Sequence, residues 1–231
     1  MTEESSRALR TFKIEALRLG LTLSPYVRAA TFGGFLLLYF TCDAPLGIAV
    51  GSELPRRGSE LPLVFWTLGI IILLGLLFEL AYAALHVGVD GSGSPTHAAR
   101  ITAYISFSWR FIALAFIGYH LRHNWWQVAT HSLYLEDVNG KLSRELSSVT
   151  SLGLPLIALG YLLGFASVCF HLNEALRTAW LRVPEGRYSH LPAILRVFVS
   201  ALGVALFLVA ANSVLDLATG ASLLHHLRPA W

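Results

Sequence analysis

Five stretches of the chain consist mainly of hydrophobic residues, and polar connections separate them. They cover residues 29–50, 61–87, 101–121, 150–173 and 191–217. A membrane-spanning helix needs about 20 predominantly apolar residues, and the uncharged runs 149–173 and 197–215 reach that length. The pattern therefore predicts an all-α, polytopic membrane protein, with a bundle of five transmembrane helices over residues 29–217.

The segment before the first hydrophobic stretch has a different character. Residues 6–23 show a basic amphipathic pattern, which predicts an interfacial helix that ends near Pro25. The chain thus divides into an N-terminal amphipathic segment (1–28), the five-helix domain and a short tail (218–231). The longest connection, residues 122–148, is polar and has room for a short surface helix.

The composition supports a membrane protein and excludes several other classes. Hydrophobic residues make up 55% of the chain and charged residues 13%, against about 25% charged residues in soluble proteins. So few charges cannot cover a soluble globule, which argues against a secreted enzyme. Net charge is +3 without a basic stripe, so a nucleic-acid binder is not expected. Cys42 and Cys169 lie in hydrophobic segments, where inert thiols are expected rather than a disulfide.

Basic residues are concentrated before the first hydrophobic stretch. They are Arg7, Arg10, Lys13, Arg18 and Arg28. Because cytoplasmic flanks of membrane helices carry an excess of lysine and arginine, we expect a cytoplasmic N-terminus and an external C-terminus. The predicted location is the inner (cytoplasmic) membrane.

Three predicted helices each carry an ionisable side chain in apolar surroundings. They are Glu79 in the second helix, Arg110 in the third and His171 in the fourth. Counting from the helix ends places each about 13 Å from the cytoplasmic side. Such a group costs roughly 2.5–3.5 kcal/mol to insert, which makes it a functional candidate. A structural Glu79–Arg110 ion pair and a hydrogen-bonded His171 are the alternative; for His171 we favour a cofactor or quinone role, because imidazole suits haem iron.

Further histidines lie near the ends of the second and third helices. His120 and His123 are three residues apart near the outer end of the third helix, so they share a helical face. We expect His123 to belong to an aromatic belt at the interface, whereas a structural and a binding role are equally open for His120. His86 follows Glu79 by two helical turns and faces the same way.

The sequence Val-Cys-Phe-His-Leu-Asn-Glu-Ala-Leu-Arg, residues 168–177, carries a resemblance to a known family. Together with five helices and a cytoplasmic N-terminus, it resembles the single-chain, cytochrome b-type membrane anchor of succinate dehydrogenases and quinol:fumarate reductases. In that family a Phe-His-x-x-x-Gly-Leu pattern on the fourth helix carries a haem b ligand, which His171 matches. A second ligand, near the outer end of the third helix, corresponds to His120. The resemblance covers roughly residues 24–216.

The chain departs from the family pattern at the opposite haem ligands. The first helix contains no histidine, Glu79 stands where the second helix would carry its ligand, and Ala175 replaces a glycine. His86 could substitute only after a shift of about 10 Å along the helix. The resemblance therefore implies zero or one haem in preference to two. His171 would bind the iron if haem is present; otherwise an ion pair of Glu79 and Arg110 fills the former haem space.

The resemblance implies a subunit that docks a flavoprotein and an iron–sulfur protein and passes electrons to or from a membrane quinone. The chain contains no cysteine cluster and no glycine-rich phosphate loop, so flavin and iron–sulfur clusters would reside in the partner subunits and the chain alone would not be catalytic. Polar residues at the cytoplasmic level could bind the quinone: Ser24, Arg28, Tyr104, Ser106 and Ser108, with His86 nearby.

Two other functions stay open. A small transporter or channel could use the layer of Glu79, Arg110 and His171, although the broken helices common in transporters are not evident. A haem b subunit of another oxidoreductase would share the shortage of histidines in the first two helices.

Overall fold

The computed structural model describes residues 3–42, 63–87, 97–126, 135–150, 153–181 and 191–220, and the regular structure in these ranges is entirely helical. The helices are α1 (Glu3–Cys42), α3 (Leu63–Val87), α4 (His97–His120), α6 (Leu135–Leu146), α7 (Leu156–Leu181) and α8 (Leu191–Thr219), and a π-helical segment, η4 (Leu121–Trp125), continues α4. The predicted all-α class is confirmed. Residues 43–50 of the first predicted stretch and most of the predicted tail lie outside the described ranges.

Three of these helices are long and apolar enough to cross a membrane. The stretches are Ile14–Phe40 in α1, Leu156–Ala179 in α7 and Ala193–Thr219 in α8. Helix α3 contains a shorter apolar stretch, Thr67–Tyr82. The chain therefore has the character of a membrane protein, and a bundle of five spans stays a prediction.

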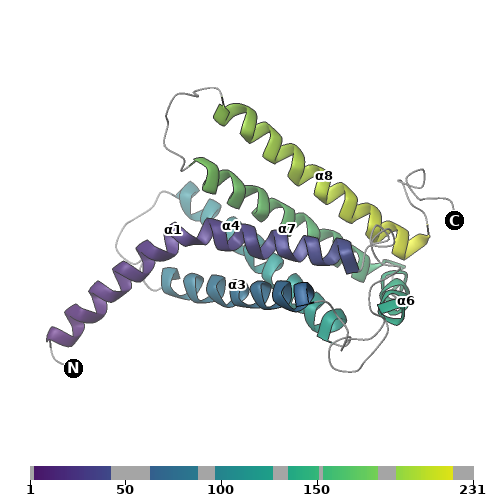
Figure 1. The fold of residues 1–231 in the computed structure, drawn as a ribbon, viewed down its shortest axis with the longest axis horizontal. Helices are drawn as coiled ribbons and strands as arrows, with labels where there is room; N and C mark the ends of the chain where they lie inside the picture. The colour runs from purple at the N-terminus through teal and green to yellow at the C-terminus, as the bar shows by residue number, and fades with distance from the viewer. Residues whose placement is uncertain are drawn as a thin grey trace.

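Helix α7 contacts α1, α4 and α8, and α1 packs in turn against α3 (Figure 1). The core between α1, α4 and α7 is rich in aromatic rings: Phe32, Phe35, Tyr39, Phe116, Tyr161 and Phe165. A hydrogen bond from the Ser167 hydroxyl to the Trp109 carbonyl oxygen joins α7 to α4. These contacts bring α1, α3, α4 and α7 together, so polar side chains on these four helices can meet in the interior.

Two glycines allow the helices to approach closely. A Cβ atom at Gly75 of α3 would collide with the Thr31 side chain of α1, and one at Gly164 of α7 would collide with the Phe116 ring of α4. Small residues at crossing points are typical of membrane helices, whose association depends on close van der Waals packing. The α1–α3 and α4–α7 crossings therefore both depend on the absence of a side chain.

Helix α1 continues through Pro25, so the prediction that the N-terminal helix ends there is wrong. A proline inside a helix removes one backbone hydrogen bond and crowds the preceding turn, at a cost of roughly 3 kcal/mol. Pro25 is buried, and α1 packs against α3 and α7. This packing outweighs the local cost, and the N-terminal part of α1 extends beyond the neighbouring helices (Figure 1).

The fourth predicted helix begins and ends later than the hydropathy pattern indicates. Gly153 has a φ of 72°, a left-handed conformation that glycine adopts readily. The backbone N–H of Gly153 donates to the Thr150 carbonyl oxygen at 2.8 Å, which closes a turn. Helix α7 therefore begins only at Leu156, directly after Pro155, and it continues to Leu181.

The long polar connection contains a short helix, α6, as the sequence predicts. Leu142 and Leu146 of α6 are buried, and the helix contacts α7 and α8. The Ser143 hydroxyl donates to the Leu217 carbonyl oxygen at 2.7 Å. Nε2 of His123 lies 2.9 Å from both carboxylate oxygens of Glu145, which ties α6 to the segment after α4. The amphipathic α6 is thus fixed to the ends of three longer helices.

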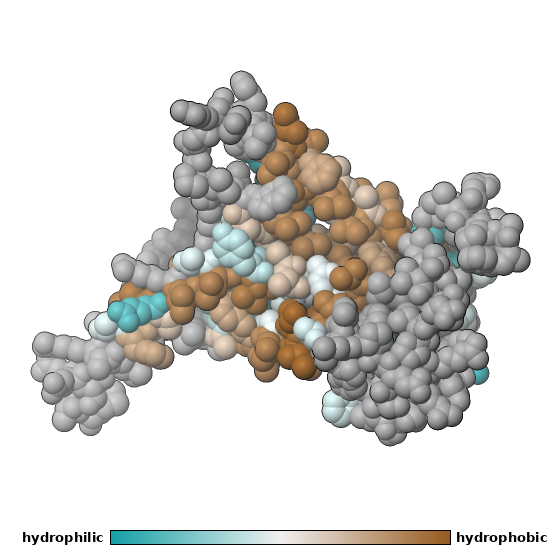
Figure 2. Space-filling view, viewed as in Figure 1, coloured by the Kyte–Doolittle hydropathy of each residue, from teal (hydrophilic) through white to brown (hydrophobic). Residues whose placement is uncertain are grey.

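Hydrophobic side chains also cover much of the outer surface. Figure 2 shows them over a broad face of the molecule. The large exposed ones on α3 and α8 include Ile70, Leu73, Leu74, Leu77, Val197, Phe198, Val204 and Leu208. Only 17% of the most apolar part of α8 is buried. Such outward-facing apolar helices are suited to lipid rather than water.

Candidate functional site

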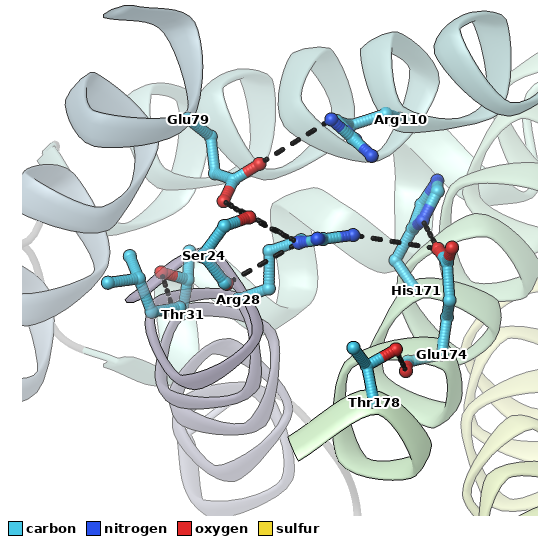
Figure 3. A network of polar contacts seen from close by, with 9 residues as sticks. Ser24, Arg28, Thr31, Glu79, Arg110, His171, Glu174 and Thr178 are labelled. Carbon is cyan, nitrogen blue, oxygen red and sulfur yellow. Dashed lines mark hydrogen bonds and ion pairs between the residues drawn. The ribbon is translucent and has the colours of Figure 1, made fainter. Parts of the chain in front are cut away.

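Polar side chains from four helices meet in the interior (Figure 3). They are Ser24 and Arg28 of α1, Glu79 of α3, Arg110 of α4, and His171 and Glu174 of α7, and we refer to them as the buried polar cluster. Two guanidinium groups and two carboxylates balance in formal charge when the imidazole is neutral. A charge-balanced arrangement is the form in which ionisable groups are tolerated at membrane depth.

Glu79 lies at the centre of the cluster and is fully buried. Its Oε1 accepts a hydrogen bond from the Ser24 hydroxyl at 3.1 Å and lies 3.6 Å from Nε of Arg28. Its Oε2 lies 4.0 Å from Nη1 of Arg110. The structure thus brings together the two residues that the sequence paired, and it adds Arg28 as a second cation on the same carboxylate.

Arg28 is on α1, and its side chain contacts both Glu79 of α3 and Glu174 of α7. Its Nε donates to the Ser24 hydroxyl oxygen at 3.0 Å, and its Nη1 lies 3.6 Å from Oε2 of Glu174. The Ser24 hydroxyl accepts from Arg28 and donates to Glu79, so it bridges the two charged groups. A planar guanidinium with five donors can serve several acceptors at once, which explains how one side chain links two carboxylates.

His171 is fully buried, and only one of its two ring nitrogens has a partner. Nδ1 lies 3.2 Å from Oε2 of Glu174, and the ring stacks on Phe32 with centroids 5.8 Å apart. An ionised carboxylate only accepts hydrogen bonds, so a neutral ring that donates to Glu174 carries its hydrogen on Nδ1 and leaves Nε2 as an acceptor. Nε2 has no hydrogen-bond partner among the described residues. Leaving such an acceptor unsatisfied costs roughly 1–3 kcal/mol, a cost that a hydrogen bond from a water or from another donor would remove.

Glu174 is the member of the cluster that the sequence pattern did not predict. Its side chain is 41% exposed and contacts both His171 and Arg28. The signal that could have identified it is its spacing, since residues three apart on a helix are neighbours. Glu174 is thus the point at which the cluster meets the surface.

The other residues predicted for a quinone site do not all join the cluster. Ser24 and Arg28 belong to it, whereas the Ser108 side chain is exposed. The side chains of Tyr104, Ser106 and His86 lie outside the described part of the structure.

His120 belongs to a separate cluster at the other end of α4. It is buried, and its Nδ1 lies 3.2 Å from both the Tyr161 hydroxyl and Nδ2 of Asn124. The rings of Phe35 and Phe116 surround it. About ten residues of helix, roughly 15 Å, separate it from the level of Arg110. His120 and His171 therefore do not form one site.

The buried polar cluster does not fit a haem held by two histidines. His171 offers one free imidazole nitrogen, which suits haem iron. Glu79 stands where the resemblance would place the opposite ligand, and its carboxylate lies within ion-pair distance of Arg28 and Arg110. Within the described ranges, no three histidine, cysteine, aspartate or glutamate side chains gather to hold a metal ion. Among the described side chains of the cluster, His171 is the one histidine that could serve as an axial haem ligand.

No family model matches the chain, and comparisons with curated proteins and with solved structures find no similar protein. The function must therefore be argued from the residues and their arrangement.

Proposed function

We propose that the chain is the membrane anchor of a succinate:quinone oxidoreductase or fumarate reductase, and that the buried polar cluster is its quinone site. In this proposal it spans the inner membrane five times with a cytoplasmic N-terminus, and it docks an iron–sulfur and a flavoprotein subunit. The observation that carries the proposal is the unpartnered Nε2 of His171, buried in a cluster that also holds Arg28 and Arg110.

The cluster has the donors and acceptors that a quinone requires. Reduction of a quinone to a quinol consumes two electrons and two protons, and the electrons would come from the iron–sulfur cluster of the partner. Guanidinium N–H groups can donate to a quinone carbonyl oxygen, as can Nε2 of His171 when the ring is protonated. In the neutral ring Nε2 accepts, which suits the hydroxyl group of the quinol. One imidazole can thus serve both redox states of the ligand.

Protons for this reaction have a path to the cluster. Glu174 is partly exposed and lies 3.2 Å from Nδ1 of His171. Histidine often acts as a proton shuttle, because both of its ring nitrogens can exchange protons. A carboxylate that is hydrogen-bonded to one nitrogen orients the ring. We infer that protons enter by Glu174 and reach the quinone through His171.

The second candidate is a transporter or channel that moves a proton or a small ion through the same cluster. The observation that favours it is the burial of Glu79 between two guanidinium groups, because intramembrane carboxylates often mark such pathways. It requires no redox partner, whereas the anchor function does. A haem b subunit of another oxidoreductase would carry haem without a succinate-oxidising flavoprotein.

The test is purification of the full chain, with its bound partners, from its native membrane. Flavin content, succinate:quinone activity and the dithionite-reduced minus oxidised visible spectrum are then measured. We expect co-purifying flavin, quinone reduction and at most one haem per chain. Haem without flavin would point to another oxidoreductase, and the absence of both would support the transporter.

Two variants of the complex then test the site itself. His171→Gln should lower quinone reduction at least tenfold while electron transfer from succinate to a soluble dye stays unchanged. His123→Gln is the matched control, because it removes an imidazole that belongs to the contact with α6. Equal quinone reduction in the two variants would refute the role of His171.

A further inference from the structure

An open groove runs along the contact of α7 and α8, on a different surface from the buried polar cluster. Its volume is about 690 Å³, and α8 forms most of it, through Arg196, Val197, Ser200, Ala201, Val204, Ala205 and Leu208, while α7 contributes Arg177. The α8 residues follow one another at alternating steps of one and three positions. They therefore lie along one face of the helix.

Both arginines lie at the same end of this groove. Arg177 is in the last turns of α7 and Arg196 is in the second turn of α8. The two helices pack against each other with their connected ends together (Figure 1). Both side chains are exposed. Under the predicted orientation this is the cytoplasmic end, where the aliphatic stems can lie on apolar surface while the guanidinium groups reach the headgroup layer.

Beyond the arginines the lining of the groove is mostly apolar. Ser200, Ala201 and Ala205 have small side chains, which leaves room beside the helix. From Arg196 to Leu208 the helix rises roughly 18 Å, which is close to one leaflet of a hydrocarbon core of about 30 Å. A ligand with a charged end and a long apolar tail would match both the length and the polarity of the groove.

We propose that this groove binds an anionic phospholipid, with its phosphate at Arg177 and Arg196 and one acyl chain along α8. Two guanidinium groups form charge-assisted hydrogen bonds with phosphate oxygens, and basic pockets between membrane helices on the cytoplasmic side are typical sites for acidic headgroups. The exposure of α8 places lipid against this groove. A soluble phosphate would leave the apolar length of the groove uncovered. This proposal is independent of the quinone site.

The experiment uses the full chain, delipidated in detergent, and native mass spectrometry to measure the binding of phosphatidylglycerol and phosphatidylcholine. We expect phosphatidylglycerol to bind at least tenfold more tightly. The double variant Arg177→Gln/Arg196→Gln should lose this preference. The control Arg122→Gln/Arg144→Gln removes the same charge from two exposed arginines elsewhere and should retain it.

A second variant tests the apolar part of the groove and keeps both arginines. Ala205→Phe fills the groove and should weaken phosphatidylglycerol binding at least fivefold, whereas Leu202→Phe, on the same helix outside the groove, should not. Equal binding of the two lipids, equal loss in the arginine variant and its control, or equal binding to both phenylalanine variants would overturn the proposal. If inorganic phosphate displaces phosphatidylglycerol at an equal concentration, the site binds anions in general and the lipid proposal is wrong.

Discussion

The substitution Glu79→Gln tests whether the buried polar cluster holds the helices together. Glu79 is fully buried, with Arg28 at 3.6 Å and Arg110 at 4.0 Å. With an effective dielectric constant of about 20, each contact corresponds to roughly 4–5 kcal/mol of Coulomb energy before desolvation is subtracted. Removal of one partner of a buried ion pair typically costs about 3–5 kcal/mol, because the other charge stays buried. We expect Glu79→Gln to lower the free energy of unfolding by an amount in that range.

The assay is reversible unfolding of the full chain in mixed micelles, followed by far-ultraviolet circular dichroism. A double-mutant cycle with Arg110→Gln isolates the pair, since the double variant buries one less unpaired charge than either single variant. We expect a coupling of about 0.5–3 kcal/mol, the range found for residues of one ion-pair network. A loss below about 1 kcal/mol for Glu79→Gln, or strictly additive effects, would show that the contact contributes little to stability.

Three further predictions concern other parts of the chain. Gly164→Ala should destabilise the protein by about 1–3 kcal/mol, because overpacking a tight contact forces shifts, whereas Gly160→Ala on the same helix meets nothing within 4 Å and should be neutral or slightly stabilising in the same unfolding assay. His123→Ala removes the contact with Glu145, and hydrogen exchange of the α6 amides should accelerate about tenfold while that of α7 stays unchanged. Glu174→Gln leaves the Nδ1 hydrogen of His171 without an ionised acceptor, and it should slow quinone reduction by the complex about tenfold without affecting dye reduction; this prediction rests on the proposed function.

The polar layer could be predicted from the sequence because depth along a helix is simple to count. The regular rise per residue places Glu79, Arg110 and His171 at one level, and the structure brings the first two into contact. The rotation of each helix is harder to predict. Ser108 was expected near the same level, but it lies two positions before Arg110, and residues two apart do not share a helical face. Its side chain is accordingly exposed.

Helix boundaries account for the other differences between expectation and structure. Proline predicts a helix end from local chemistry alone, but burial of Pro25 keeps α1 continuous, so Arg28 lies well inside a helix instead of near its start. Because of the turn at Gly153, α7 begins later than expected. The left-handed conformation of a single glycine cannot be predicted from a hydropathy pattern. Tertiary packing and backbone conformation decided these boundaries, and composition does not encode either of them directly.

The continuity of α1 has a mechanical consequence. A helix of 40 residues is about 60 Å long when measured along its axis, and Arg28 lies on the same continuous helix as the N-terminal turns that project beyond the other helices (Figure 1). A tilt or rotation of the projecting end would move the guanidinium that joins Glu79 to Glu174. The buried polar cluster is thus connected to the projecting N-terminal turns by one continuous helix.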